Sequence, residues 1–251
     1  MTLSKLQIKS ITNLRLKKYR NLENKFLVEG EKAVRDGLNS GYDYELILAT
    51  QEYLDKNPHT LKGNQKAEII KNNDFQKITD TVNPQGIAAI FKKPGQKKDW
   101  TNNLNSELIV CLENISDPGN VGTIIRNCDW FGIKNIILSN TCADVYNPKT
   151  IRSSVGSLFH TNIFFSCNLL DDLNILKNKG CKILSSALGG KSVFNYKTGE
   201  KTIIILGNEA NGISKNILSF SDNFITIPKI GNAESLNVAN ASAVILGELT
   251  K

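Results

Sequence analysis

Histidine is scarce in this chain of 251 residues, and its cysteines lack the spacing of a metal site. The two histidines, His59 and His160, lie far apart, and the five cysteines at positions 111, 128, 142, 167 and 181 form no Cys-x-x-Cys pair. Zinc sites need closely spaced Cys or His ligands, and an odd, scattered set of cysteines does not build a disulfide framework. We therefore expect no metal, and free thiols in a reducing cytoplasm.

Long hydrophobic runs and nucleotide-binding motifs are also missing. No apolar run exceeds seven residues, which is too short to cross a bilayer, and the basic N-terminus lacks the apolar stretch of a secretory signal. No G-x-G-x-x-G follows a strand. Residues 185–192 end in Gly-Lys-Ser, but serine replaces the first glycine of a P-loop and no helix pattern follows. These absences disfavour a membrane protein, a dinucleotide enzyme and a nucleotide hydrolase.

The most informative segment present joins a Pro/Gly turn to a helix that carries one arginine. Residues 108–112 (LIVCL) are apolar and β-branched, which predicts a buried strand. After the turn at 117–119, we expect a helix to begin near Asn120. Asn120 and Arg126 are less than two helical turns apart, so an amide and a guanidinium could face one ligand.

Two later segments complete a pattern of three. Residues 203–214 (IIILGNEANGIS) predict a buried strand followed by a glycine loop with one carboxylate, and residues 225–241 predict a strand, a loop and a small-residue helix. In this order and spacing the three segments resemble the motifs of the SpoU (TrmH-type) RNA ribose 2′-O-methyltransferases of the SPOUT superfamily. Tyr19-Arg20 and residues 26–34 resemble the start of that family's ribosomal-protein-like substrate domain.

The resemblance implies the fold, the cofactor and the partners. It implies an α/β catalytic domain with a C-terminal trefoil knot, S-adenosylmethionine as methyl donor, RNA as substrate and a homodimer. Ribosomal RNA is favoured over transfer RNA because an added N-terminal domain is typical of the ribosomal RNA members. The positions that match the family's cofactor pocket are Leu206, Gly207, Ile227, Ser235 and Leu236. The residue types suit this role, since glycine permits close backbone approach and apolar side chains can cover an adenine ring.

The family's catalytic arginine matches Arg126, and its neighbouring polar positions match Asn120, Glu209, Ser235 and Asn237. A neutral arginine acting as base near pH 7 would cost about 7 kcal/mol. We therefore expect Arg126 to stay cationic, gripping a phosphate and stabilising the forming alkoxide.

Two positions depart from the family pattern, and they bear on packing or the dimer surface rather than on the reaction. Lys229 and Asn240 stand where the family often has apolar or small residues. Alternative functions are a transfer RNA enzyme, a non-catalytic RNA-binding protein with the same fold, and an α/β enzyme acting on a small phosphorylated or methyl-accepting substrate.

Positive charge is concentrated at the N-terminus. Residues 1–25 hold seven basic residues against Glu23, which gives +6 of the net charge of +7. This segment is either an RNA-contacting face, with Arg15, Lys17, Lys18 and Arg20 joining Arg126 as RNA contacts, or a frayed, solubilising tail.

The chain divides near residue 100. Residues 1–95 are expected to form an RNA substrate-binding α/β domain, 96–106 a linker and 107–251 the catalytic domain. In the first domain we expect strands at 26–28, 44–49 and 86–91 and a helix at 31–40. In the second, alternating helices and strands predict a mostly parallel sheet covered on both faces. Its expected strands are 107–113, 134–139, 161–167, 182–188, 202–207 and 223–228.

Overall fold

The chain folds into two compact units. The computed structural model describes residues 3–96, 99–104, 106–199, 201–208 and 211–251. Unit 1 comprises Met1–Gly95 together with Asp144–Phe159, and unit 2 comprises Gln96–Ala143 together with His160–Lys251. The later segment 144–159 thus packs with the N-terminal residues, an association that a linear division of the chain does not contain. The domain boundaries expected above stay a prediction.

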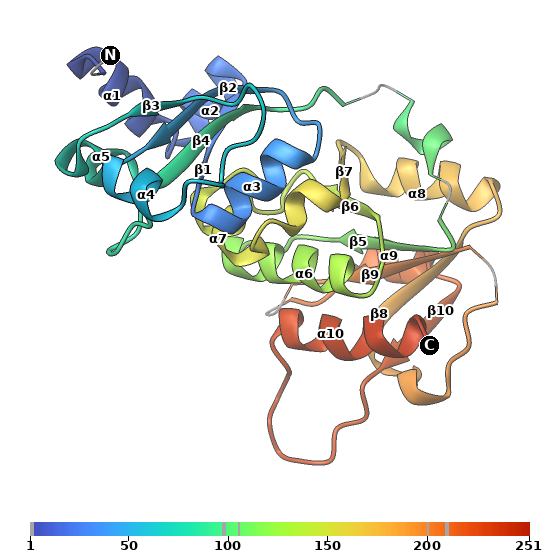
Figure 1. Cartoon of the computed structure of the whole chain (residues 1–251). Helices are drawn as coiled ribbons and strands as arrows, with labels where there is room; N and C mark the ends of the chain where they lie inside the picture. The colour runs from blue at the N-terminus through green and yellow to red at the C-terminus, as the bar shows by residue number, and fades with distance from the viewer. Residues whose placement is uncertain (1–2, 97–98, 105, 200, 209–210) are drawn as a thin grey trace. The chain divides into compact units, whose positions relative to one another are not determined.

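Unit 1 is built on a mixed four-stranded sheet in the order β1-β4-β2-β3. β4 pairs antiparallel with both β1 and β2, and β2 pairs parallel with β3. The three strands and the helix expected here are present within two residues of the expected ends. The elements of residues 1–95 are α1 (Lys5–Asn13), α2 (Lys17–Glu23), β1 (Lys25–Glu29), α3 (Glu31–Asn39), β2 (Tyr44–Ala49), α4 (Gln51–Lys56), β3 (Ala67–Ile69), α5 (Asn72–Ile78) and β4 (Ile87–Lys92) (Figure 1).

The basic N-terminal segment forms two helices, so the alternative of a frayed tail is wrong for its described part. Ser4 and Gln7 form a capping box that starts α1, satisfying two backbone N–H groups reciprocally. Ile11 and Leu14 are buried with Phe75 of α5 in one apolar cluster. Burial of these side chains fixes the segment to the sheet.

Segment 144–159 of unit 1 carries the helix α7 (Pro148–Ser154). The Phe26 ring on β1 packs against the rings of Tyr146 and Phe159, with centroid distances of 4.6 and 6.3 Å. This aromatic cluster explains why a segment from the middle of the chain belongs to unit 1.

Unit 2 contains a six-stranded sheet in the order β10-β8-β9-β5-β6-β7, and every pairing in it is parallel. The six expected strands are confirmed. β8 runs on to Ser192, where Lys191 and Ser192 pair with β10, so the Gly-Lys-Ser sequence is strand. The elements are β5 (Leu108–Leu112), α6 (Pro118–Trp130), β6 (Asn135–Ser139), β7 (Asn162–Ser166), α8 (Leu169–Asn178), β8 (Lys182–Ser192), β9 (Thr202–Leu206), α9 (Lys215–Phe220), β10 (Asn223–Thr226) and α10 (Val238–Leu249).

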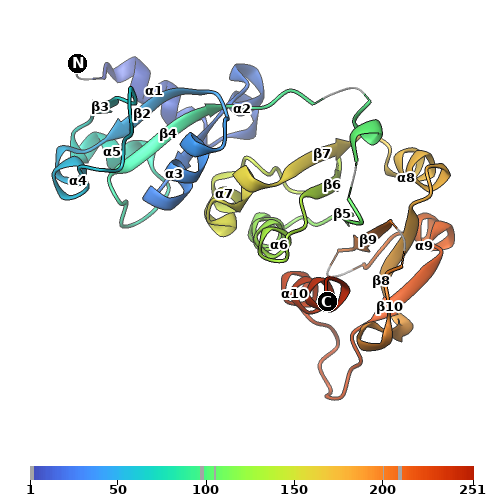
Figure 2. The same cartoon turned by 45° about the vertical axis from the view of Figure 1, so that its right-hand side comes forward.

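Helices cover both faces of this sheet, as expected. Figure 2 shows α6 and α10 on one side and α8 and α9 on the other. Ile109 and Ile203 point toward Leu173 of α8, and alternate strand residues turn to the α6 side. Trp100 and Leu104, from the stretch expected to be a linker, are buried in the core of unit 2.

The described helices include none with the length and apolar character that a membrane span requires.

Candidate functional site

The strand order of unit 2 has a topological switch point between β5 and β9. These strands are neighbours, but the chain leaves β5 through α6 toward β6 and leaves β9 through α9 toward β10, on the opposite side. In parallel α/β sheets, ligands bind where the carboxyl ends of two such strands diverge. The loops after Leu112 and Leu206, which carry two of the three sequence motifs, meet at this point.

Two residues that sequence reasoning did not single out tie these loops together. The Glu113 N–H donates to the carbonyl of Leu206 at 2.9 Å, and the Glu113 carboxylate accepts from the Ser214 N–H at 2.9 Å. The Asn208 amide donates to the Asn114 carbonyl at 2.9 Å. Asn114 has a φ of +59°, a left-handed conformation that asparagine tolerates better than most residues. An asparagine two residues after the end of a buried strand was the available signal.

Helix α6 begins two residues earlier than expected, at Pro118. The Asp117 carboxylate accepts from the Asn120 N–H at 2.9 Å and caps the helix, and proline occupies the first turn, where its missing N–H costs nothing. The Pro/Gly sequence that suggested a turn is therefore the first turn of the helix. Asn120 lies inside that turn.

The structure brings Asn120 and Asn237 together although they are 117 positions apart. The Asn237 amide donates to the Asn120 side-chain oxygen at 3.2 Å. The Asn237 oxygen also caps α10, accepting from the Ala239 and Asn240 N–H groups at 2.9 and 3.3 Å. The first and third motifs are thus joined at the start of α10.

A second contact fixes α6 along α10. The Asn127 amide donates to the Ala239 carbonyl at 3.0 Å and to the Ser242 hydroxyl at 2.8 Å. Ser242 is fully buried, so this polar cluster is shielded from water.

Arg126, next to Asn127 on α6, is exposed and makes no hydrogen bond or ion pair with another described residue. Its five donors remain available to an anionic ligand. Glu209, the carboxylate expected near it, lies outside the described residues.

The expected cofactor positions differ in accessibility. Leu206 is buried and Gly207 half-buried, whereas Ser235 is exposed and Leu236 is 53% exposed. The loop from Ile227 to Asn237 has no helix or strand and extends away from the sheet (Figure 1). The two family departures, Lys229 and Asn240, are both exposed.

Packing within the loop requires glycine at position 207, a constraint that the sequence did not suggest. A Cβ built there would lie 2.6 Å from the Gly212 carbonyl carbon and from the Ile213 nitrogen, so the loop's own closure requires glycine. Glycine at this position is therefore required by the packing of the loop, in addition to the expected approach of a ligand to the backbone.

The expected RNA contact by Arg20 is wrong. Arg20 is 1% exposed. Its guanidinium donates to the Asp144 carboxylate at 2.7 and 3.1 Å and to the Leu14 and Arg15 carbonyls at 2.8 and 2.6 Å. Four of its five N–H groups serve the interior of unit 1, and the guanidinium is buried, so it does not present a surface to a phosphate.

The other basic residues of this segment are placed differently. Arg15 is partly buried and donates to the Lys77 carbonyl at 2.9 Å, whereas Lys17 and Lys18 are exposed. Of the four residues expected to contact RNA here, Lys17 and Lys18 are therefore the two with exposed side chains.

All five cysteines are free thiols. Burial raises the pKa of Cys111, Cys128 and Cys142, which keeps these thiols protonated near neutral pH. No group of three or more His, Cys, Asp or Glu suited to a metal ion occurs among the residues that the structure describes.

Comparison with known proteins gives matches over both units. The model of the SpoU rRNA Methylase family matches residues 107–247, and that of the MRM3-like substrate binding domain matches residues 5–89. The 23S rRNA (guanosine(2553)-2'-O)-methyltransferase RlmP of Bacillus subtilis is 33% identical over 244 residues, covering 97% of this chain and 95% of that protein.

Solved structures agree over nearly the whole chain. A TrmH-family structure from Porphyromonas gingivalis is 33% identical, covers 98% of this chain and 97% of its own, and has a TM-score of 0.86. The AdoMet-bound rRNA methyltransferase of Sinorhizobium meliloti is 26% identical, covers 99% and 96%, and has a TM-score of 0.86.

Proposed function

Because the chain belongs to the SpoU rRNA methylase family, we propose that it transfers a methyl group from S-adenosylmethionine to a ribose 2′-hydroxyl of ribosomal RNA. The observation that carries the proposal is the arrangement at the carboxyl ends of β5 and β9. There the Asn120–Asn237 pair joins two motifs, and an unpaired, exposed Arg126 lies farther along the same helix. A non-catalytic RNA-binding protein would have no need of this arrangement.

The residues of the 227–237 loop fit the methyl donor. Residues 228–236 make no hydrogen bond to another described residue, so their backbone N–H and C=O groups remain available to an adenine. Ile227 and Leu236 offer apolar surface at the two ends of the loop. We assign Leu206, Gly207, Ile227, Ser235 and Leu236 to this pocket, and the trefoil knot of the family to the segment that carries it.

The donor, when bound, supplies an electrophilic methyl group on its sulfonium. The ribose 2′-oxygen forms the new bond to carbon as the bond to sulfur breaks, S-adenosylhomocysteine leaves, and the hydroxyl proton passes to water or a neighbouring group. Arg126 holds the adjacent phosphate and stabilises the negative charge that develops on the 2′-oxygen. Asn120 and Asn237 orient the ribose, and Ser235 adds a hydroxyl on the same loop as Asn237. Glu209 is assigned a polar role from the family match alone.

Ribosomal RNA is the substrate class that the full-length relative supports. The Bacillus subtilis protein is named for 23S rRNA, and its match includes the N-terminal region. Free thiols throughout are consistent with a reducing compartment such as the cytoplasm.

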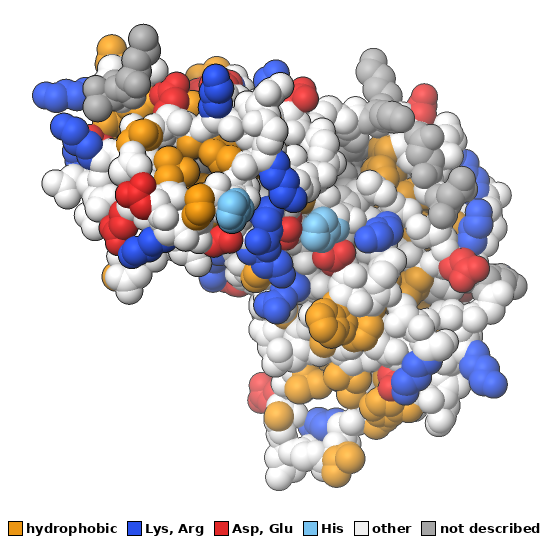
Figure 3. Space-filling model, in the orientation of Figure 1, with side chains coloured by type: hydrophobic (Ala, Val, Ile, Leu, Met, Phe, Trp, Pro, Cys, Tyr) orange, Lys and Arg blue, Asp and Glu red, His pale blue; other side chains and the backbone are white. Residues whose placement is uncertain are grey.

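A homodimer is also part of the proposal. Figure 3 shows hydrophobic side chains on the surface of unit 2. Trp130, at the end of α6, is 82% exposed, and Val244 on α10 is 36% exposed. Large exposed apolar side chains on two packed helices favour an interface between copies. Sedimentation of Trp130→Glu should show a lighter species than wild type; an unchanged sedimentation coefficient would contradict an interface at α6.

Mapping of 2′-O-methyl groups tests the reaction in the cell. RNA from cells with and without the gene should differ at a ribose of ribosomal RNA. A difference in transfer RNA alone would move the assignment to the alternative substrate, and identical maps would contradict the proposal.

A further inference from the structure

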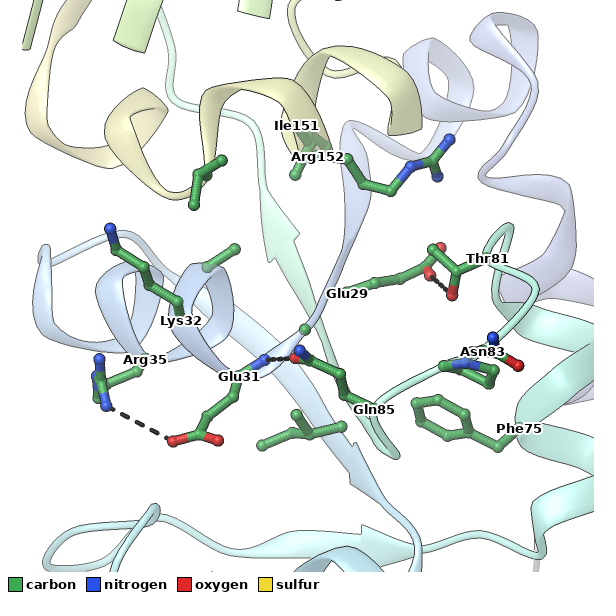
Figure 4. Close-up of a pocket in the computed structure, with 15 residues that line it drawn as sticks. Glu29, Glu31, Lys32, Arg35, Phe75, Thr81, Asn83, Gln85, Ile151 and Arg152 are labelled. Carbon is green, nitrogen blue, oxygen red and sulfur yellow. Dashed lines mark hydrogen bonds and ion pairs between the residues drawn. The ribbon is translucent and has the colours of Figure 1, made fainter.

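Unit 1 contains a cavity of about 470 Å³ between the start of α3, the loop before β4 and α7. Figure 4 shows Lys32 and Arg35 projecting from α3, with Thr81, Asn83 and Gln85 along the opposing loop. The volume is within the range of small-ligand sites. We propose that this cavity binds a single unstacked nucleotide of the RNA substrate, an inference that rests on the proposed function.

The floor of the cavity is apolar and rigid. Phe75, Ile87 and Ile151 lie beneath it and are each at most 2% exposed, and the half-buried Pro84 and Val155 present apolar surface to it. Buried side chains of this kind cannot move aside at low cost. A flat, apolar group such as a nucleobase is the ligand portion that such a floor accommodates.

The opposing loop is held in place before any ligand arrives. The Glu29 carboxylate accepts from the Asp80 N–H at 2.9 Å and from the Thr81 hydroxyl at 3.1 Å. At the other end, the Gln85 side-chain oxygen accepts from the Glu31 N–H at 2.7 Å and so caps α3. Both ends of the loop are therefore fixed, which lowers the ordering cost of binding.

The polar groups left over at the cavity are mostly donors. Among the described residues, no partner is found for the Lys32 ammonium, the Gln85 amide nitrogen or the buried Arg152 Nη1. The exposed Asn83 amide is also unused.

The acidic groups at the cavity, in contrast, are already engaged. Glu29 holds the loop, and Glu31 lies 3.6 Å from Arg35. The ligand must therefore bring acceptors.

A nucleotide meets these requirements together. Its phosphate supplies acceptors for the exposed Lys32 ammonium, its base carbonyl and ring nitrogens accept from the two amides, and its base covers the apolar floor. The Arg152 guanidinium, which pairs with Asp80 at 3.0 Å, adds positive charge beside the cavity. A protein or lipid ligand of comparable size does not combine a flat apolar group with so many acceptors.

Two variants separate ligand binding from folding. Gln85→Glu keeps the oxygen that caps α3 but replaces the amide donor with a second acceptor, and Lys32→Gln removes the exposed cation. Lys66→Gln is the matched control, because Lys66 is an exposed lysine of unit 1 outside the cavity. All three variants are made in the whole chain of 251 residues. Their binding of S-adenosylhomocysteine is measured as a check that unit 2 is intact.

Filter binding to an unmodified 23S rRNA transcript, across a salt series, gives the readout. We expect each cavity variant to lose about tenfold in RNA affinity. The salt slope of Lys32→Gln should also fall by about 0.7 to 0.9, while the control stays at wild type. RNA affinities of both cavity variants equal to the control would overturn the inference.

Two further outcomes are distinguishable. A nucleoside monophosphate that binds wild type as tightly as the transcript does would show that the cavity serves a free nucleotide, which contradicts the RNA assignment. Wild-type protein without affinity for the transcript would overturn the proposed function, and this inference with it.

Discussion

Replacing Arg20 tests whether a basic residue near the N-terminus serves the fold or the RNA. Arg20→Met removes four hydrogen bonds, two of them to the Asp144 carboxylate and two to backbone carbonyls. The Asp144 side chain is 11% exposed, so its charge loses its partner in a poorly hydrated environment. Breaking a buried pair from one side costs about 3 to 5 kcal/mol.

Urea unfolding of the full-length protein measures this cost. Lys17→Met is the matched control, since Lys17 is exposed and its substitution should change the free energy of unfolding by about 0.5 kcal/mol or less. The double variant Arg20→Met with Asp144→Leu should recover part of the loss, because no unpaired carboxylate remains buried. An Arg20→Met protein as stable as wild type, with a reduced salt slope for RNA binding, would refute the structural role.

Three further predictions concern the reaction, the cofactor and the RNA. Arg126→Ala should lower single-turnover methylation about a hundredfold or more at unchanged S-adenosylhomocysteine affinity, and Arg126→Lys should also be poor; turnover equal to wild type would exclude the arginine. Gly207→Val should weaken S-adenosylhomocysteine binding, measured by calorimetry, because the added side chain collides with the loop. Leu236→Ala should weaken the same binding about tenfold because an apolar contact is lost. If both variants bind S-adenosylhomocysteine as tightly as wild type, the cofactor pocket lies elsewhere. Replacing Lys17 and Lys18 together with Gln should reduce the salt slope of RNA binding by roughly 1.4 to 1.8, and an unaltered slope would show that these two lysines do not contact RNA.

The strands of unit 2 were predictable because their pattern is local. Runs such as Leu108–Leu112 and Thr202–Leu206 are short, apolar and β-branched, and such runs predict buried parallel strands without knowledge of their partners. Short elements were not predictable in the same way. The strand Ala67–Ile69 has three residues, too few to show a period, and its pairing with β2 defines it.

Non-local packing accounts for the rest. The placement of segment 144–159 in unit 1 depends on contacts between Tyr146 and Phe26, which no local pattern encodes. Arg20 belongs to a run of basic residues, and its burial follows from Asp144, 124 positions away.

At the site, the motifs identified the residues but not the hydrogen bonds between them. Asn120 and Asn237 were identified from the motifs, whereas their hydrogen bond depends on how α6 packs along α10. Glu113 and Asn114 were seen only as the end of a strand, although they hold the Leu206–Ser214 loop. A polar residue whose function is to fix another loop has no signature in its own neighbourhood.

Transfer of a labelled methyl group tests the central claim most directly. Purified protein, methyl-labelled S-adenosylmethionine and an unmodified 23S rRNA transcript are incubated, and the RNA is digested to nucleosides. Label is expected in one 2′-O-methylnucleoside with wild-type protein and none above background with Arg126→Ala. Label in a base-methylated nucleoside, or no transfer to ribosomal RNA by wild-type protein, would contradict it.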